Sequence, residues 1–265
     1  MGHTRLGDLP HSQKWKAVVA AMSSADFLDQ QRRSQEMERI AVGVLDAAQT
    51  GLDKAIEDIG LRRTFYLLTQ LVLAARESDW RNRLGTVGIE MAEGDSTFEL
   101  TAKIQDAIDD YVSAHGRPTD ISEIAQQAAG EAVTKLAEPT ATTLFGSGEA
   151  ELQTAIRSLS TGKGFAELGQ AFFGRFMAHF MNFYLSRATA SQIGVGIRDV
   201  NDLSDFNNQL RTHCQETAKI VHDFCGEWYS KTEFKEGITQ ENTSRFMAVA
   251  LKKLQAELKR QREAL

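Results

Sequence analysis

The sequence has few prolines, few cysteines and no long apolar run, and each shortage excludes a class of protein. Its three prolines leave long stretches in which helices can form without interruption. Two cysteines, Cys214 and Cys225, are too few for a disulfide framework and favour a reducing compartment. No run of about 18 consecutive apolar residues occurs, so no membrane span is expected. Because the N-terminus also lacks the apolar segment of a signal peptide, we expect a cytoplasmic protein of bacterial type.

An excess of basic residues is also lacking. The formal net charge is −6, which argues against a protein that coats nucleic acid with its whole surface. The 42% hydrophobic and 25% charged residues are typical of a soluble globular chain. Its 265 residues are enough to bury a substantial core in one domain or two.

Catalytic and metal-binding motifs are absent. The stretch STGKGFAELG (160–169) has Arg157 where a phosphate-binding loop requires its first glycine. The segment HCQETAKIVHDFC (213–225) holds two cysteines that lie roughly 16 Å apart on a continuous helix, too far to share a disulfide or an ion. His222 and Cys225 supply two ligands where a structural zinc site needs four. We therefore expect no metal and no cofactor, and nothing in the sequence indicates an enzyme.

The apolar residues recur with a helical period nearly throughout, which predicts an all-α fold. STFE (96–99) is a capping box that opens one helix. The segment 138–149 contains Pro139 and two glycines and is the best linker, so the expected division is 1–137, a linker at 138–149, and 150–265. The prediction is a multi-helix bundle of about eight or nine helices, arranged as one bundle or two sub-bundles. Helices are expected after Ser12, from about 25, and at about 64–75, 96–114, 121–137, 149–160, 164–190, 203–225 and 239–263.

The stretch FFGRFMAHFMNFYLSR (172–187) is the most apolar of these helices. On a helical wheel its polar residues form one narrow stripe, and aromatic and other apolar side chains cover most of the remainder. A helix of this kind is usually buried against several neighbours. Two alternatives remain: a ligand site at the stripe, or a helix that inserts into membranes. The ligand-site residues would be Arg175, His179 and Asn182.

Three segments are candidates for contact with a partner. In the C-terminal helix a basic face indicates a solvated last turn, with an acidic partner or nucleic acid as the alternative. GEWYSKTEF (226–234) follows an expected helix end at Gly226, and its aromatic pair either packs onto the bundle or anchors an interface. The N-terminal segment is expected to be ordered along the first bundle. The candidate contact residues are, in the C-terminal helix, Lys252, Lys253, Lys259 and Arg260; in the aromatic pair, Trp228 and Tyr229; and in the N-terminal segment, Leu6, Leu9 and Trp15.

Four stretches, TRLGDLPHSQKWKAVV, FYLLTQLVLAAR, FFGRFMAHFMNFYLSR and GEWYSKTEF, together resemble an uncharacterised family of all-helical bacterial proteins. That family is associated with multi-gene clusters of anti-phage defence. The resemblance spans most of the chain and implies a role within a larger assembly. It includes no catalytic motif, so it assigns no functional residue.

These observations favour a non-enzymatic helical interaction protein that serves as a subunit or adaptor of a multi-protein assembly. The expected partner is another protein subunit, and nucleic acid is a partner only through the C-terminal basic helix. One alternative is a helical sensor that binds a small ligand or peptide at the polar stripe. The other is an effector that engages membranes with the 164–190 helix.

Overall fold

The computed structural model describes residues 43–44, 49–137, 149–192 and 200–263. Within these ranges the chain forms helices joined by turns and short loops, and it contains no strand. The predicted all-α multi-helix bundle is therefore confirmed. Leu6, Leu9 and Trp15 lie outside the described residues.

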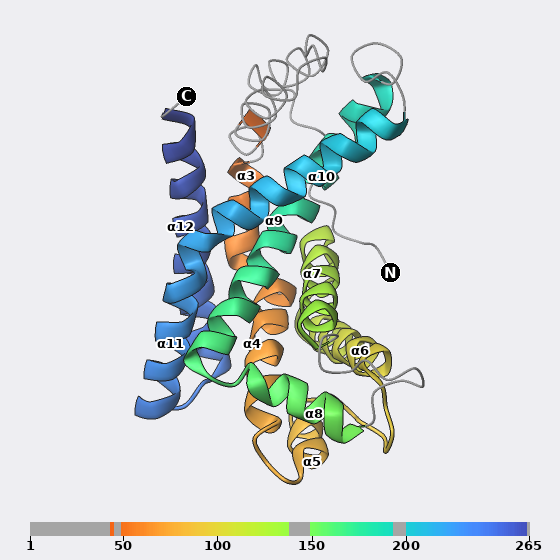
Figure 1. Ribbon diagram of the computed structural model, residues 1–265, viewed down its shortest axis with the longest axis vertical. Coiled ribbons are helices and arrows are strands. Elements are labelled where there is room, and N and C mark those ends of the chain that lie inside the picture. Colours follow the sequence, from red (N-terminus) through yellow and green to blue (C-terminus); the bar gives the residue numbers. More distant parts are fainter. Residues whose placement is uncertain (1–42, 45–48, 138–148, 193–199, 264–265) are drawn as a thin grey trace.

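The helices α4, α7 and α12 run roughly along the long axis of the molecule, α10 runs obliquely to them, and α8 lies across one end (Figure 1). The helix α9 contacts α7, α10 and α11, and α4 contacts α6, α7 and α12. The helices are α3 (Gln49–Glu57), α4 (Ile59–Ala74), α5 (Trp80–Gly85), α6 (Thr97–His115), α7 (Asp120–Ala137), α8 (Glu149–Ser158), α9 (Gly162–Gln192), α10 (Val200–Thr217), α11 (His222–Lys235) and α12 (Gln240–Glu263), with a 3-10 turn η2 (Ala218–Val221) between α10 and α11.

The local signals in the sequence mark several of these elements correctly. The capping box is present at the start of α6, where Ser96 caps the helix and Glu99 returns to the Ser96 backbone N–H. The expected helix at 64–75 is the larger part of α4. The expected helix at 203–225 is wrong in two respects: η2 divides it, and α11 continues through Gly226 to Lys235. GEWYSKTEF therefore lies wholly within α11 and is not a loop.

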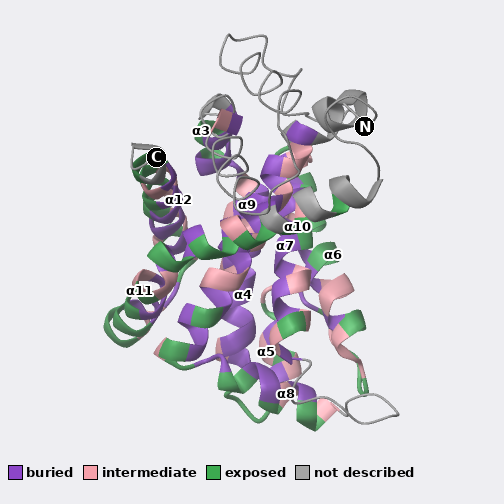
Figure 2. Ribbon diagram, turned by 45° about the horizontal axis from the view of Figure 1, so that its top comes forward, coloured by how far each residue is buried: buried purple, intermediate pink, exposed green. Residues whose placement is uncertain are grey.

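One aromatic cluster forms the centre of the core. Phe65 of α4 lies 5.4 Å from Phe172 and 5.3 Å from Phe173 between ring centroids, and both partners belong to α9. Phe246 of α12 stacks on Phe65 at 5.4 Å. The described aromatic residues of 172–180 are buried (Figure 2). The prediction that this stretch is a core helix is therefore confirmed.

The helices on the two sides of 138–149 share this core. Phe65 precedes that segment in the chain, whereas Phe172, Phe173 and Phe246 follow it, and all belong to a single hydrophobic cluster. The greater part of the proposed linker, 138–148, lies outside the described residues. The described helices on both sides of this segment thus contribute to one hydrophobic cluster.

Glycines on α9 and α11 allow these two helices to approach closely. A Cβ atom added to Gly226 would lie 2.5 Å from the carbonyl oxygen of Gly162, and one added to Gly169 would lie 2.5 Å from Cys225 Sγ. Both distances are shorter than atoms in packed interiors tolerate. The helix pair therefore depends on the absence of side chains at these positions.

Both cysteines are buried and free, and burial raises the pKa of the Cys214 thiol from 9.0 to about 12. The unfolded chain loses this proton above pH 9 while the folded chain keeps it, so unfolding is favoured as pH rises from 9 to 12. This thiol alone is expected to lower the free energy of unfolding by about 1.4 kcal/mol per pH unit in that range. Urea unfolding of a Cys214→Ala variant should show a shallower alkaline loss than the parent. Identical slopes in the two proteins would contradict the assignment.

Candidate functional site: a basic groove beside α7

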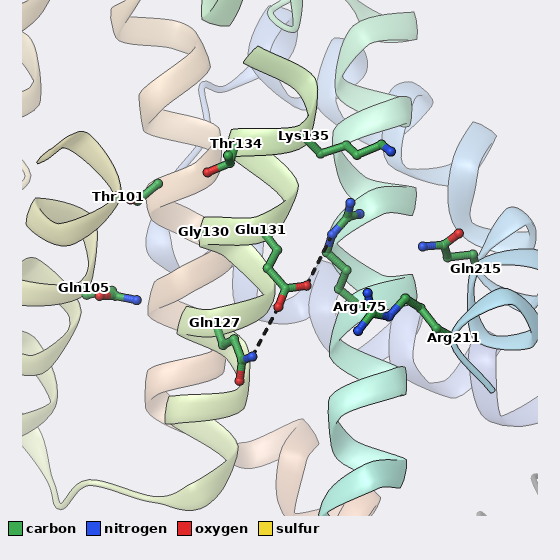
Figure 3. Close-up of a pocket in the computed structure, with 10 residues that line it drawn as sticks. All are labelled: Thr101, Gln105, Gln127, Gly130, Glu131, Thr134, Lys135, Arg175, Arg211 and Gln215. Carbon is green, nitrogen blue, oxygen red and sulfur yellow. Dashed lines mark hydrogen bonds and ion pairs between the residues drawn. The ribbon is translucent and has the colours of Figure 1, made fainter. Parts of the chain in front are cut away.

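A groove with a volume of about 630 Å³ runs along α7 and is bordered by α6, α9 and α10. Figure 3 shows its side chains: Arg175 lies against the Glu131 carboxylate, Arg211 extends from α10 toward Arg175, and Lys135 projects from the next turn of α7. The volume is within the range of protein sites that hold ligands. The lining residues are Thr101, Gln105, Gln127, Gly130, Glu131, Thr134, Lys135, Arg175, Arg211 and Gln215.

The Glu131 carboxylate lies at the centre of the groove's polar contacts. Its Oε1 atom lies 2.9 Å from His179 Nε2 on α9 and accepts a hydrogen bond of 3.2 Å from Gln127 Nε2. Its Oε2 atom lies 3.7 Å from Arg175 Nε, which is too long for a hydrogen bond. One oxygen is therefore held firmly, and the other makes only a loose ion pair.

Arg175 is held in place and largely shielded from water. Its Nη1 donates a hydrogen bond of 3.0 Å to the Ala171 carbonyl oxygen one turn earlier in α9. The side chain is 11% exposed. Burial lowers the pKa of Arg175, and the nearby charge of Arg211 lowers it further, whereas Glu131 raises it. The Arg175 guanidinium is thus shielded from water and close to the charge of Arg211. Two neighbouring cations of this kind favour the binding of an anion.

Positive charge exceeds negative charge in the groove. Three cationic side chains, Lys135, Arg175 and Arg211, line it together with one carboxylate, that of Glu131. Within the described part of the chain, Lys135 and Arg211 form no salt bridge. One carboxylate cannot balance three cations, so the groove has capacity for a further anionic group.

Two of the three polar residues predicted on the aromatic helix lie at this site. Arg175 lines the groove. His179 is not a lining residue, but its Nε2 contacts the carboxylate of Glu131, which is one. Asn182 is half-buried and is not a lining residue. Glu131, Lys135 and Arg211 were not predicted, because they come from α7 and α10 and no local pattern indicates that these helices meet Arg175.

The other predicted contact residues lie on α11 and α12. Tyr229 is 1% exposed and stacks on Phe165 at 4.3 Å, so it is a core residue and not an interface anchor. Trp228 is half-buried and stacks on Phe246 at 4.2 Å. Both therefore pack onto the bundle, which is one of the two interpretations that the sequence leaves open for this segment.

The predicted basic contact residues of α12 are exposed, as expected for a solvated face: Lys252, Lys253, Lys259 and Arg260. Arg260 makes two hydrogen bonds to Glu257, and the Lys253 ammonium lies 4.9 Å from the centre of the Phe224 ring. Lys252 and Lys259 are the other exposed cations of this face. Arg260 and Lys253 on this face therefore contact other described residues. Lys135 and Arg211 in the groove, by contrast, form no salt bridge within the described part of the chain.

The described residues contain no group of three or more histidine, cysteine, aspartate or glutamate side chains placed to hold a metal ion. Among the described helices, none combines the length and the apolar character that crossing a bilayer requires. Comparison with protein-family models, curated proteins and solved structures found no match.

Proposed function

We propose that this protein is a non-enzymatic helical interaction protein that binds an acidic segment of a partner protein in the groove beside α7. The observation that supports this function is the excess of cations there, since Lys135, Arg175 and Arg211 line the groove together with one carboxylate. Arginine side chains offer paired donors that match a carboxylate, and shielding from water strengthens such contacts. In this proposal the helical bundle serves as a rigid support that positions these groups.

The form of the groove favours a polypeptide segment over a small molecule. Sites for small ligands usually enclose most of the ligand's surface. Here Gln105, Gln127, Lys135, Arg211 and Gln215 are all exposed, so the groove is open along its length. An extended acidic segment can lie in such a groove while its flanking residues remain in water.

The surrounding charges favour a protein over a nucleic acid. Nucleic-acid binding relies on many cations that follow a phosphate backbone. The helix α6 beside the groove exposes Asp106, Asp109 and Asp110, which would repel a continuous polyanion. A short acidic segment that contacts Arg175 and Arg211 and does not extend along α6 avoids this repulsion.

The test is the affinity for a fluorescein-labelled hexaglutamate peptide, with hexaglutamine as the neutral comparison. The double variant Arg175→Gln/Arg211→Gln should bind the acidic peptide more than tenfold more weakly, because hydrogen bonds to charged groups contribute about 1.5–3 kcal/mol each. The double variant Lys252→Gln/Lys259→Gln on α12 removes the same charge and should bind as the parent does. Fluorescence anisotropy at low ionic strength measures both.

Two results would contradict the proposal. One is equal binding by the parent and the Arg175→Gln/Arg211→Gln variant, and the other is equal binding of hexaglutamate and hexaglutamine. The resemblance to a defence-associated family makes the products of neighbouring genes the first natural partners to test. A partner that binds through the groove should co-purify with the parent and not with the groove variant.

A further inference from the structure

We infer that Glu131 is a built-in competitor of the partner's acidic side chain, and that it sets the affinity of this site. The inference rests on the proposed function, because it concerns the same groove. It assigns the ligand group as a carboxylate that takes over the loose contact of Glu131 Oε2 with Arg175.

The two Glu131 oxygens differ in a way that suits exchange. Oε1 has close contacts with His179 at 2.9 Å and Gln127 at 3.2 Å. Oε2 lies 3.7 Å from Arg175 Nε, so an incoming carboxylate displaces no short hydrogen bond there. Glu131 can lose its contact with Arg175 and keep both contacts of Oε1.

The position of Arg175 is suited to accept the replacement. The hydrogen bond of Nη1 to the Ala171 carbonyl fixes the guanidinium on α9, so it need not be reoriented when a ligand binds. Arg211 extends from α10 toward Arg175 (Figure 3). A ligand carboxylate between the two arginines would receive donors from both.

Glu131 opposes this binding by charge. Its side chain is 37% exposed, and its negative charge repels a second carboxylate a few ångströms away. Two like charges at that distance near a protein surface repel one another enough to change affinity by about tenfold after allowance for solvent screening. Removing the charge of Glu131 should therefore tighten binding.

The test compares Glu131→Gln with the full-length parent in the hexaglutamate assay. Glutamine keeps the shape of glutamate, and its amide oxygen can still accept hydrogen bonds from His179 and Gln127. The variant should bind about tenfold more tightly. Glu236→Gln removes the same charge at the end of α11, away from the groove, and should leave affinity within twofold of the parent. Thermal melting checks that both variants are folded.

The outcomes separate this inference from the proposed function. Unchanged or weaker binding by Glu131→Gln overturns the competitor role; if the parent binds and Arg175→Gln/Arg211→Gln does not, the proposed function stands. Equal tightening by Glu131→Gln and Glu236→Gln also overturns it, because the effect would then be one of net charge. Absence of binding by both the parent and Glu131→Gln overturns the function and the inference together.

Discussion

Replacing Phe65 by alanine is expected to lower the free energy of unfolding by about 3–5 kcal/mol, the range for large aromatic side chains removed from a packed core. The Phe65 ring is fully buried and meets rings from three other parts of the chain. Phe172 and Phe173 lie on α9, Trp228 lies on α11 and Phe246 lies on α12. The variant therefore leaves a cavity where four helices meet.

Phe98 provides the matched control for this substitution. It lies in the first turn of α6 and is 80% exposed, so Phe98→Ala should change stability by no more than about 0.5 kcal/mol. Urea unfolding followed by circular dichroism measures both variants. A loss of less than 1 kcal/mol for Phe65→Ala would show that this ring does not join the helices as described.

Replacing Gly226 by alanine is expected to destabilise the protein by about 1–3 kcal/mol, the usual cost of excess volume in a well-packed interior. The new Cβ would lie 2.5 Å from the Gly162 carbonyl oxygen and 3.1 Å from the Ala166 Cβ. A backbone oxygen cannot move aside as a flexible side chain can, so α9 and α11 must separate. This cost exceeds the gain of about 1 kcal/mol that alanine brings inside a helix.

Gly130 in α7 provides the opposite case. A Cβ added there would have its nearest neighbour, the Thr101 Cβ, at 3.9 Å, which is an ordinary contact distance. Gly130→Ala should therefore be neutral or stabilising by up to about 1 kcal/mol. Melting temperatures that fall equally for Gly226→Ala and Gly130→Ala would refute the argument that close packing requires glycine at Gly226.

The wrong helix boundary at Gly226 has the same physical origin. A glycine in a sequence predicts a helix end, because it is less favourable than alanine inside a helix. In this protein the glycine lies inside α11, where it allows contact with Gly162. The reason for it lies on another helix, more than sixty residues earlier in the chain, so local sequence patterns do not reveal it.

Features that depend on one helix were predictable, and features that depend on two were not. The Ser96 capping box and the buried face of α9 follow from residues close together in the sequence. The polar stripe of that helix placed Arg175 and His179 on one side, and both contact Glu131. Glu131 itself and Arg211 join the site only through the packing of α7 and α10 against α9, which the sequence pattern does not encode locally.

The most direct measurement of the central claim is a titration of the ¹⁵N-arginine-labelled protein with hexaglutamate, followed by NMR of the arginine Nε–H signals. The signals of Arg175 and Arg211 should shift and saturate together, because both line the groove. The signal of Arg260, which is paired with Glu257 on α12, should not move. Shifts at Arg260 that match those at Arg175 and Arg211, or no shift at the groove arginines, would contradict the claim that this groove is the binding site.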